Sequence, residues 1–205
     1  MARPSLADIV SVAGVAVGLG TAWLYTAGWI YAYVYFDRFR IPLLMLDFPF
    51  EHSLVYGGLV VRKEIWLALA SVVVFIALWW ALARWAVRLG RFAVTMIVVL
   101  TIVVAFALAR SAGRSAALAD FAIQRRSDYA AYPRVRVTWE GVDAPADAFM
   151  GDILRTDCAR LLAATKHRLF LIRSIRGAAD VDLDTFVLPA DKVVIRIRAD
   201  YTSCP

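Results

Sequence analysis

Long apolar stretches separated by short polar ones fill the first half of the chain. Three stretches, roughly 9–36, 65–83 and 92–109, contain no charged residue. Each is long enough to cross, as a helix, the roughly 30 Å hydrocarbon core of a bilayer, which takes about 20 residues. The pattern therefore predicts an α-helical membrane domain with three transmembrane helices.

After Pro133 the pattern changes to an alternation of apolar and polar residues with a period of two. Such alternation is typical of strands with one buried face. Two neighbouring segments of this kind, separated by Thr165 to His167, predict a hairpin. The predicted strands lie near 135–139, 160–164, 168–173, 186–188 and 193–198. We expect a small β-rich (α+β) domain outside the membrane, with a sheet of four or five strands, since 186–188 is short, and a short helix at 146–156.

These patterns divide the chain into three parts. Residues 1–110 are the expected three-helix transmembrane domain. Residues 111–131 are rich in Ala and Arg, with apolar residues at helical spacing, and predict a helical stalk that continues the third span. Residues 132–205 form the small sheet domain.

The segment 37–64, between the first two spans, is amphipathic. Part of it is apolar enough to suggest a further span, but Asp47, Pro49, Glu51 and His52 lie in its middle. Each charge at the centre of a bilayer would cost about 2.5 to 3.5 kcal/mol. We therefore expect an interfacial segment, with a new helix that starts near Pro49, because proline is tolerated in the first turn of a helix.

Asp47, Glu51 and His52 are the only cluster of titratable side chains near the predicted membrane plane. Ionisable groups in this position are candidates for a proton relay, an ion site or a metal site. The alternative is that the two acids pair with nearby arginines or Lys63 at the interface, since one His and two acids do not form a recognised metal-ligand pattern.

Gly14, Gly18 and Ala22 follow one another at four-residue spacing in the first span. This spacing places small side chains on one helix face, where a second helix can approach closely. The face predicts packing within the chain or self-association. Small residues are also common in transmembrane helices without any special role.

Arg84, Arg88 and Arg91 occupy the short connection between the second and third spans, which also contains Gly90 and no acid. The connection predicts a tight helical hairpin with basic anchors at its turn. A purely basic turn favours the cytoplasmic side, which would place the C-terminal domain outside. The basic residues of the other flanks, counted together, favour the opposite orientation.

Cys158 and Cys204 both lie in the C-terminal domain. A disulfide between them would suit an oxidising periplasm, and two free thiols are the alternative. Together with the basic hairpin, the pair favours a periplasmic C-terminal domain. The apolar first segment is longer than the core of a signal peptide and lacks a small-residue cleavage site, so we expect it to be retained.

Composition supports a membrane protein. Hydrophobic residues make up 61% of the chain and the mean hydropathy is +0.66, whereas soluble domains are nearer 45 to 50% apolar. The net charge of +6 comes from basic residues interleaved with acids, which does not indicate a nucleic-acid partner. Arginine far outnumbers lysine and asparagine is absent, a bias that suggests a GC-rich bacterial genome.

No catalytic, nucleotide-binding or metal-binding motif stands out, so we expect no cofactor, no metal and no enzymatic activity. The acids Asp180, Asp182 and Asp184 alternate but lack the spacing of a calcium loop. The leading hypothesis is an accessory, scaffold or sensing subunit of the bacterial inner membrane that acts through protein contacts. The expected partners are the lipid bilayer and, through the transmembrane helices, a protein partner or a second copy of the chain. The alternatives are a homo-oligomeric pore or transport component that uses the Asp47 cluster, and a membrane-bound enzyme.

Overall fold

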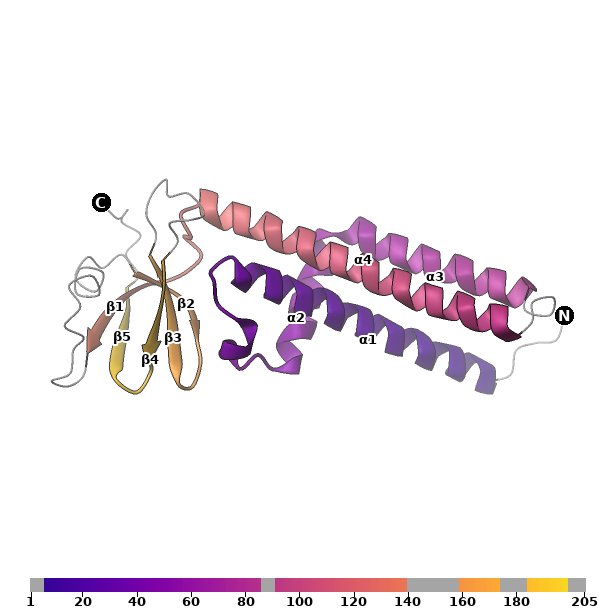
Figure 1. The fold of residues 1–205 in the computed structure, drawn as a ribbon, viewed down its shortest axis with the longest axis horizontal. Coiled ribbons are helices and arrows are strands. Elements are labelled where there is room, and N and C mark those ends of the chain that lie inside the picture. Colours follow the sequence, from indigo (N-terminus) through magenta and orange to yellow (C-terminus); the bar gives the residue numbers. More distant parts are fainter. Residues whose placement is uncertain (1–5, 86–90, 140–158, 174–183, 199–205) are drawn as a thin grey trace. The chain divides into compact units, whose positions relative to one another are not determined.

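The computed structural model describes residues 6–85, 91–139, 159–173 and 184–198. The first two ranges are mostly helical (Figure 1). The helices are α1 (Leu6–Asp37), the short 3-10 helix η1 (Leu43–Leu46), α2 (Phe50–Lys63), α3 (Ile65–Trp85) and α4 (Arg91–Arg126). All three apolar stretches are thus helical, and α2 begins directly after Pro49, as the sequence predicts.

The C-terminal part holds one antiparallel sheet of five strands. The strands are β1 (Arg134–Trp139), β2 (Ala159–Ala164), β3 (Arg168–Arg173), β4 (Thr185–Pro189) and β5 (Val193–Arg198). Their order across the sheet is β4-β3-β2-β1-β5, so β1 and β5, distant in sequence, are neighbours. The five predicted strands and the β2–β3 hairpin are confirmed, whereas the predicted helix at 146–156 lies outside the described residues.

The chain forms two compact units. The first contains Met1–Val34 and Pro49–Leu118, and the second contains Tyr35–Phe48 and Ala119–Pro205. The end of α1 and the η1 segment belong to the same unit as the sheet. Helix α4 continues without a break to Arg126, and its last residues belong to this unit as well.

Helices of the first unit pack closely through glycines. A Cβ placed on Gly28 of α1 would overlap the backbone of Ser53 in α2, and one placed on Gly57 would overlap that of Leu24. Gly113 of α4 lies equally close to the carbonyl of Ala27. The backbones of α1, α2 and α4 therefore meet where no larger side chain fits.

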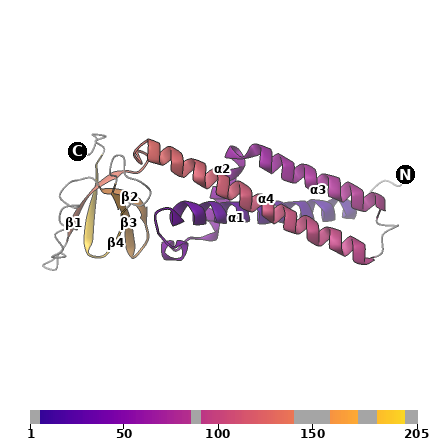
Figure 2. The ribbon, with the colours of Figure 1, turned by 45° about the horizontal axis from the view of Figure 1, so that its top comes forward.

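Elsewhere in the first unit the apolar side chains are largely uncovered. Figures 1 and 2 show α3 running antiparallel to α4. Trp66 at the start of α3 and Phe92 at the start of α4 are 80% and 79% exposed, and Val17 of α1 is 69% exposed. Apolar surface of this extent is uncommon on a soluble monomer.

Two helical segments are long and apolar enough to cross a membrane, by length and composition alone. They are Ala13–Asp37 in α1 and Phe92–Arg126 in α4. The apolar part of α3 that meets the same composition is the shorter Ile65–Leu78 within the described residues. A third span is therefore not confirmed.

The sheet of the second unit is buried on both faces at β3. Leu169 and Leu171 belong to a core cluster with Val135, Val137 and Leu188. Phe170 and Ile172 point to the other face, because side chains alternate along a strand, and both are fully buried. On this second face the hydroxyl of Thr185 donates a hydrogen bond to the carbonyl of Phe39, 2.6 Å away.

The segment before α2 is a buried part of the second unit. Phe39, Ile41, Leu43 and Leu46 are all buried. The interfacial placement that the sequence suggested for this segment stays a prediction. Leu44, between two of them, is 88% exposed, since the tight 3-10 turn of η1 directs successive side chains to different sides.

Candidate functional site

One transverse row of the sheet places arginines at neighbouring positions on three strands. The row crosses all five strands in register, through pairs that face each other on neighbouring strands. From β4 to β5 its members are Thr185, Ile172, Arg160, Arg134 and Arg198. Three arginines thus occupy adjacent positions across β2, β1 and β5. Like charges directly opposite each other destabilise a sheet.

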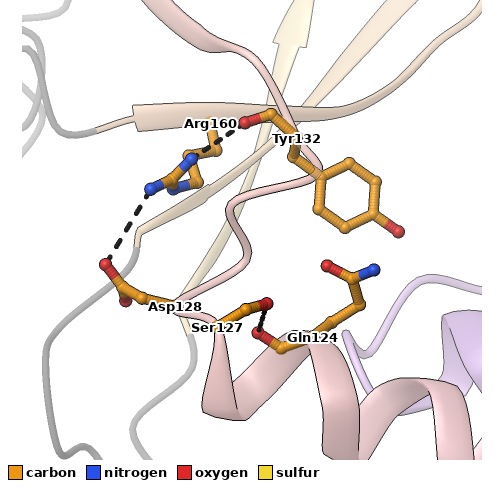
Figure 3. Close-up of polar contacts among 5 residues, drawn as sticks. All are labelled: Gln124, Ser127, Asp128, Tyr132 and Arg160. Carbon is orange, nitrogen blue, oxygen red and sulfur yellow. Dashed lines mark hydrogen bonds and ion pairs between the residues drawn. The ribbon is translucent and has the colours of Figure 1, made fainter. Parts of the chain in front are cut away.

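Arg160 is buried, at 6% exposure. Its Nη1 donates a hydrogen bond to the carbonyl of Tyr132, 2.9 Å away. Its Nη2 lies 3.8 Å from the carboxylate of Asp128, which is 35% exposed (Figure 3). Strong charge-assisted hydrogen bonds are about 2.7 to 2.9 Å long, so the carboxylate compensates the buried charge only in part.

The turn that follows α4 places Asp128 and Tyr132 next to Arg160. Asp128 and Tyr129 both have left-handed backbone conformations, with φ of 52° and 55°. The N–H of Tyr129 donates to the carbonyl of Gln124, as in a helix-terminating Schellman motif. Ser127 donates to the same carbonyl through its hydroxyl (Figure 3). Aspartate tolerates the left-handed region better than most residues, which suits it to this position.

Aromatic side chains anchor the same turn from the other side. The hydroxyls of Tyr35 and Tyr132 share a hydrogen bond. The Phe39 ring packs edge-on against Phe121 and Tyr129. These contacts join the end of α1, the end of α4 and the turn into one apolar cluster, so the backbone that carries Asp128 and Tyr132 is fixed on two sides.

The surroundings of Arg160 disfavour its positive charge. Burial lowers the pKa of the Arg160 guanidinium, the neighbouring Arg134 lowers it further, and Asp128 raises it. Arginine nevertheless stays protonated at neutral pH. The Nε atoms of Arg160 and Arg134 are both buried and, within the described residues, neither has a hydrogen-bond partner. Two guanidinium groups thus keep unused donors side by side.

The acidic cluster predicted from the sequence is spread over both units. Asp47 caps η1 with a left-handed backbone in the second unit, whereas Glu51 and His52 lie in the first turn of α2 in the first unit. All three are exposed. In the part of the chain that the structure describes, no group of three or more His, Cys, Asp or Glu side chains could hold a metal ion.

Gly14 and Gly18 of the predicted small-residue face are open among the described residues. No described atom beyond the local helix lies within 4 Å of a Cβ placed on Gly14 or Gly18, and Ala22 is half-buried. Close approach of helix backbones occurs at Gly28, Gly57 and Gly113. Self-association through Gly14 and Gly18 stays a prediction.

Of the predicted hairpin arginines, Arg84 lies at the end of α3, where its guanidinium stacks on the Trp80 ring, 5.2 Å from the ring centre. Arg88 and the side chain of Arg91 lie outside the described residues, as do Cys158 and Cys204. The predicted disulfide therefore stays a prediction.

The arginine row was not predicted. The signal available in the sequence was Arg160, a single charge inside the otherwise apolar strand Ala159–Ala164. A second signal was the alternation of Arg134 and Arg136 with valines, and of Arg196 and Arg198 with isoleucines. Which of these arginines would meet depended on the β1–β5 and β1–β2 pairings, which the sequence did not give.

Compared with protein-family models, curated proteins and solved structures, the chain matches none. The residues described above are therefore the basis for assigning a function. The row offers cationic hydrogen-bond donors, a chemistry suited to holding an anion.

Proposed function

We infer that the chain is a multi-pass protein of the bacterial inner membrane that acts as an accessory, scaffold or sensing subunit through protein contacts. Its sheet-bearing unit would lie on the periplasmic side. The observation that carries the proposal is the uncovered apolar surface of α1, α3 and α4. In the two candidate spans, only 11% and 6% of the 18-residue apolar stretch is buried within the structure.

Apolar helix surfaces that the chain itself leaves exposed must be shielded from water. A core helix of a soluble protein would be buried by the rest of its domain, whereas most of the apolar surface of these two candidate spans is exposed in the part of the chain that the structure describes. Burial of apolar surface contributes roughly 25 cal/mol per Å². Lipid, or lipid together with a partner helix, would shield the apolar surface of helices of this length.

Contacts within the second unit support three crossings. The segment Tyr35–Phe48 and the residues after Ala119 belong to one compact unit, joined by the Thr185 to Phe39 hydrogen bond. Both must therefore lie on the same side of a membrane. If α4 crosses, the chain needs one more crossing between the two segments. The 14 residues of α2 are too few for this, whereas the 21 residues of α3 suffice.

The open face of α1 supports protein contacts. Gly14 and Gly18 have no close neighbour outside their own helix among the described residues, so a helix of a partner or of a second copy can approach them. In a membrane, small residues of this kind favour helix association because backbones come close and pack well.

The orientation rests on the sequence. The connection with Arg84, Arg88 and Arg91 is basic and favours the cytoplasm. With α4 crossing, the sheet would then lie in the periplasm, where a Cys158–Cys204 disulfide could form.

Association in the membrane tests the proposal. Gly14→Leu combined with Gly18→Leu should abolish cross-linked complexes of the tagged chain in native membranes, because leucine holds a neighbouring helix away. Gly20→Leu is the matched control, since Gly20 is equally open and lies on the other side of α1. We expect complexes to persist in this control and in the Asp47→Ala, Glu51→Ala, His52→Ala triple variant.

Three results would contradict the proposal. Recovery of the chain in the soluble fraction would remove the membrane location. Complexes that survive the Gly14 and Gly18 substitutions would remove the α1 contact. Loss of complexes in the triple alanine variant, at unchanged protein level, would favour a role for the acidic cluster instead.

A further inference from the structure

We propose that Arg134 and Arg160 form a binding site for a phosphate group. The site lies on the face of the sheet opposite the core cluster, where β1 and β2 pair. The inference is independent of the membrane location, because every residue that it uses belongs to the second unit.

The register of the sheet brings the two side chains together. Arg134 and Arg160 are direct partners across β1 and β2. Directly opposite residues of an antiparallel pair have Cβ atoms about 4.5 to 5.5 Å apart and point to the same face. The effect of Arg134 on the pKa of Arg160 reflects the same proximity.

The guanidinium donors of the pair are incompletely used. Arg160 uses one Nη on the Tyr132 carbonyl and approaches Asp128 with the other. Its Nε, and the Nε of Arg134, are buried without a hydrogen-bond partner among the described residues. A buried donor of a charged group is costly to leave unsatisfied. An ion with several acceptor oxygens between the two side chains would satisfy both Nε atoms.

Charge favours phosphate over a single carboxylate. Two guanidinium groups and the distant Asp128 carboxylate leave the pair with a positive excess. A phosphomonoester carries about −1.5 to −2 charges at neutral pH and three strong acceptor oxygens. Arginine binds such oxygens in a bidentate manner through its planar fork. Arg134 is half-buried, which gives a small ion access to the pair, whereas Arg160 is held in place by Tyr132.

Titration calorimetry of the full chain in a non-ionic detergent tests the site, with inorganic phosphate as the probe at constant ionic strength. We expect saturable binding to one site. Arg134→Gln should weaken it by about tenfold or more, as expected for the loss of a charge-assisted hydrogen bond. Arg134→Lys, which keeps the charge and loses the fork, should weaken binding nearly as much.

Arg196→Gln is the matched control, because it removes the same charge from the same face one row away. Binding should change by less than about twofold in this variant. Arg160→Gln should also abolish binding. Because that variant could unfold, the result at Arg134 decides the test, with circular dichroism to verify that the sheet is retained.

Two sources of phosphate are distinguished by a second titration with short-chain phosphatidic acid. If it competes with inorganic phosphate, the phosphate group alone is recognised, and if only the lipid binds, the ligand is a lipid headgroup. Either result supports the site. If neither inorganic phosphate nor the short-chain lipid bound saturably, the proposed site would be overturned, since water alone would then satisfy the donors. Equal binding of acetate, or equal weakening by Arg134→Gln and Arg196→Gln, would also overturn it.

Discussion

Arg160 couples the sheet to the turn that follows α4, and it does so with a buried charge. Its hydrogen bond to the Tyr132 carbonyl fixes the turn by backbone geometry, whereas its contact with Asp128 is long and partly solvated. Removing one partner of a buried ion pair is expensive because the other charge stays behind. The two contacts of Arg160 should therefore differ in their contribution to stability.

Asp128→Asn isolates the charge of this contact. Asparagine has nearly the same shape and also tolerates the left-handed backbone at this position. We expect the free energy of unfolding of the second unit to fall by about 1 kcal/mol, nearer the value of exposed pairs than of buried ones, since Asp128 is partly exposed. Thermal unfolding of the full chain in detergent measures the change.

Asp191→Asn is the control for this substitution, because Asp191 is exposed in the turn between β4 and β5. Its effect should be close to zero. If the two variants unfold at the same temperature, the Asp128 carboxylate contributes nothing to holding Arg160.

Thr185→Val tests the hydrogen bond that joins the segment Tyr35–Phe48 to the sheet. Valine keeps the shape and removes the hydroxyl, so the Phe39 carbonyl loses its partly buried donor. We expect a loss of about 1 to 2 kcal/mol in unfolding free energy. Thr138→Val removes a comparable but exposed hydroxyl bond to Val194 and should cost clearly less. Equal melting temperatures for the two variants would contradict this difference.

Among the elements, strands and helices could be predicted from sequence periodicity, but their partners could not. The alternation in 193–198 was sufficient to identify β5. Its pairing with β1 brings together residues about 60 positions apart, and local pattern carries no information on such contacts. Arg160 could thus be assigned to a strand but not to the arginine row.

The contacts of the segment 35–48 could not be predicted for a related reason. Its apolar residues and proline suit a membrane interface as well as a protein core, because both bury apolar side chains. The structure adds the contacts of Phe39 with Phe121 and Thr185, and these residues are distant from it in sequence. Glycine spacing likewise did not indicate which helices meet. The four-residue spacing in the sequence is at Gly14 and Gly18, whereas close backbone contacts occur at Gly28 and Gly57, which lie on different helices.

Gly57→Ala tests the contact between α1 and α2. The added methyl would overlap the Leu24 carbonyl, a backbone atom that cannot rotate away. We expect destabilisation of the first unit by about 1 to 3 kcal/mol, as for overpacked sites. The helical signal in circular dichroism, followed during heating in detergent, measures it.

Gly58→Ala is the neighbouring control. A Cβ at Gly58 meets nothing within 4 Å among the described residues. Alanine should therefore stabilise α2 slightly, by about 0.5 to 1 kcal/mol, because glycine loses more backbone freedom on folding. Equal melting temperatures for the two alanine variants would show that α1 and α2 do not meet at Gly57.

At the scale of the whole molecule, the second unit is assembled from two separate segments of the chain. Tyr35–Phe48 joins residues that follow Ala119, and α2, α3 and most of α4 lie between them in sequence. Such a unit can fold only if the intervening chain returns to the side where it left. This condition links the folding of the second unit to the number of membrane crossings.

The number of crossings can be read by cysteine labelling in intact cells with a membrane-impermeant thiol reagent. Starting from a chain with Cys158→Ser and Cys204→Ser, single cysteines are introduced as Leu44→Cys, in the highly exposed position of η1, or as Arg88→Cys, in the hairpin. With three crossings and the sheet outside, Leu44→Cys should react in intact cells and Arg88→Cys only after lysis. Two crossings would place both cysteines on the same side, because α3 would no longer separate them.

The native cysteines complete the test, because they report the side of the sheet and the disulfide together. In intact cells the wild-type chain should react only after reduction, since Cys158 and Cys204 are predicted to be bonded in the periplasm. The Cys158→Ser variant leaves Cys204 without that partner and should react without reduction. Reaction of both chains only after lysis would place the sheet in the cytoplasm. If Leu44→Cys and Cys204 then reacted from opposite sides, Tyr35–Phe48 could not pack with the sheet in the membrane-inserted protein.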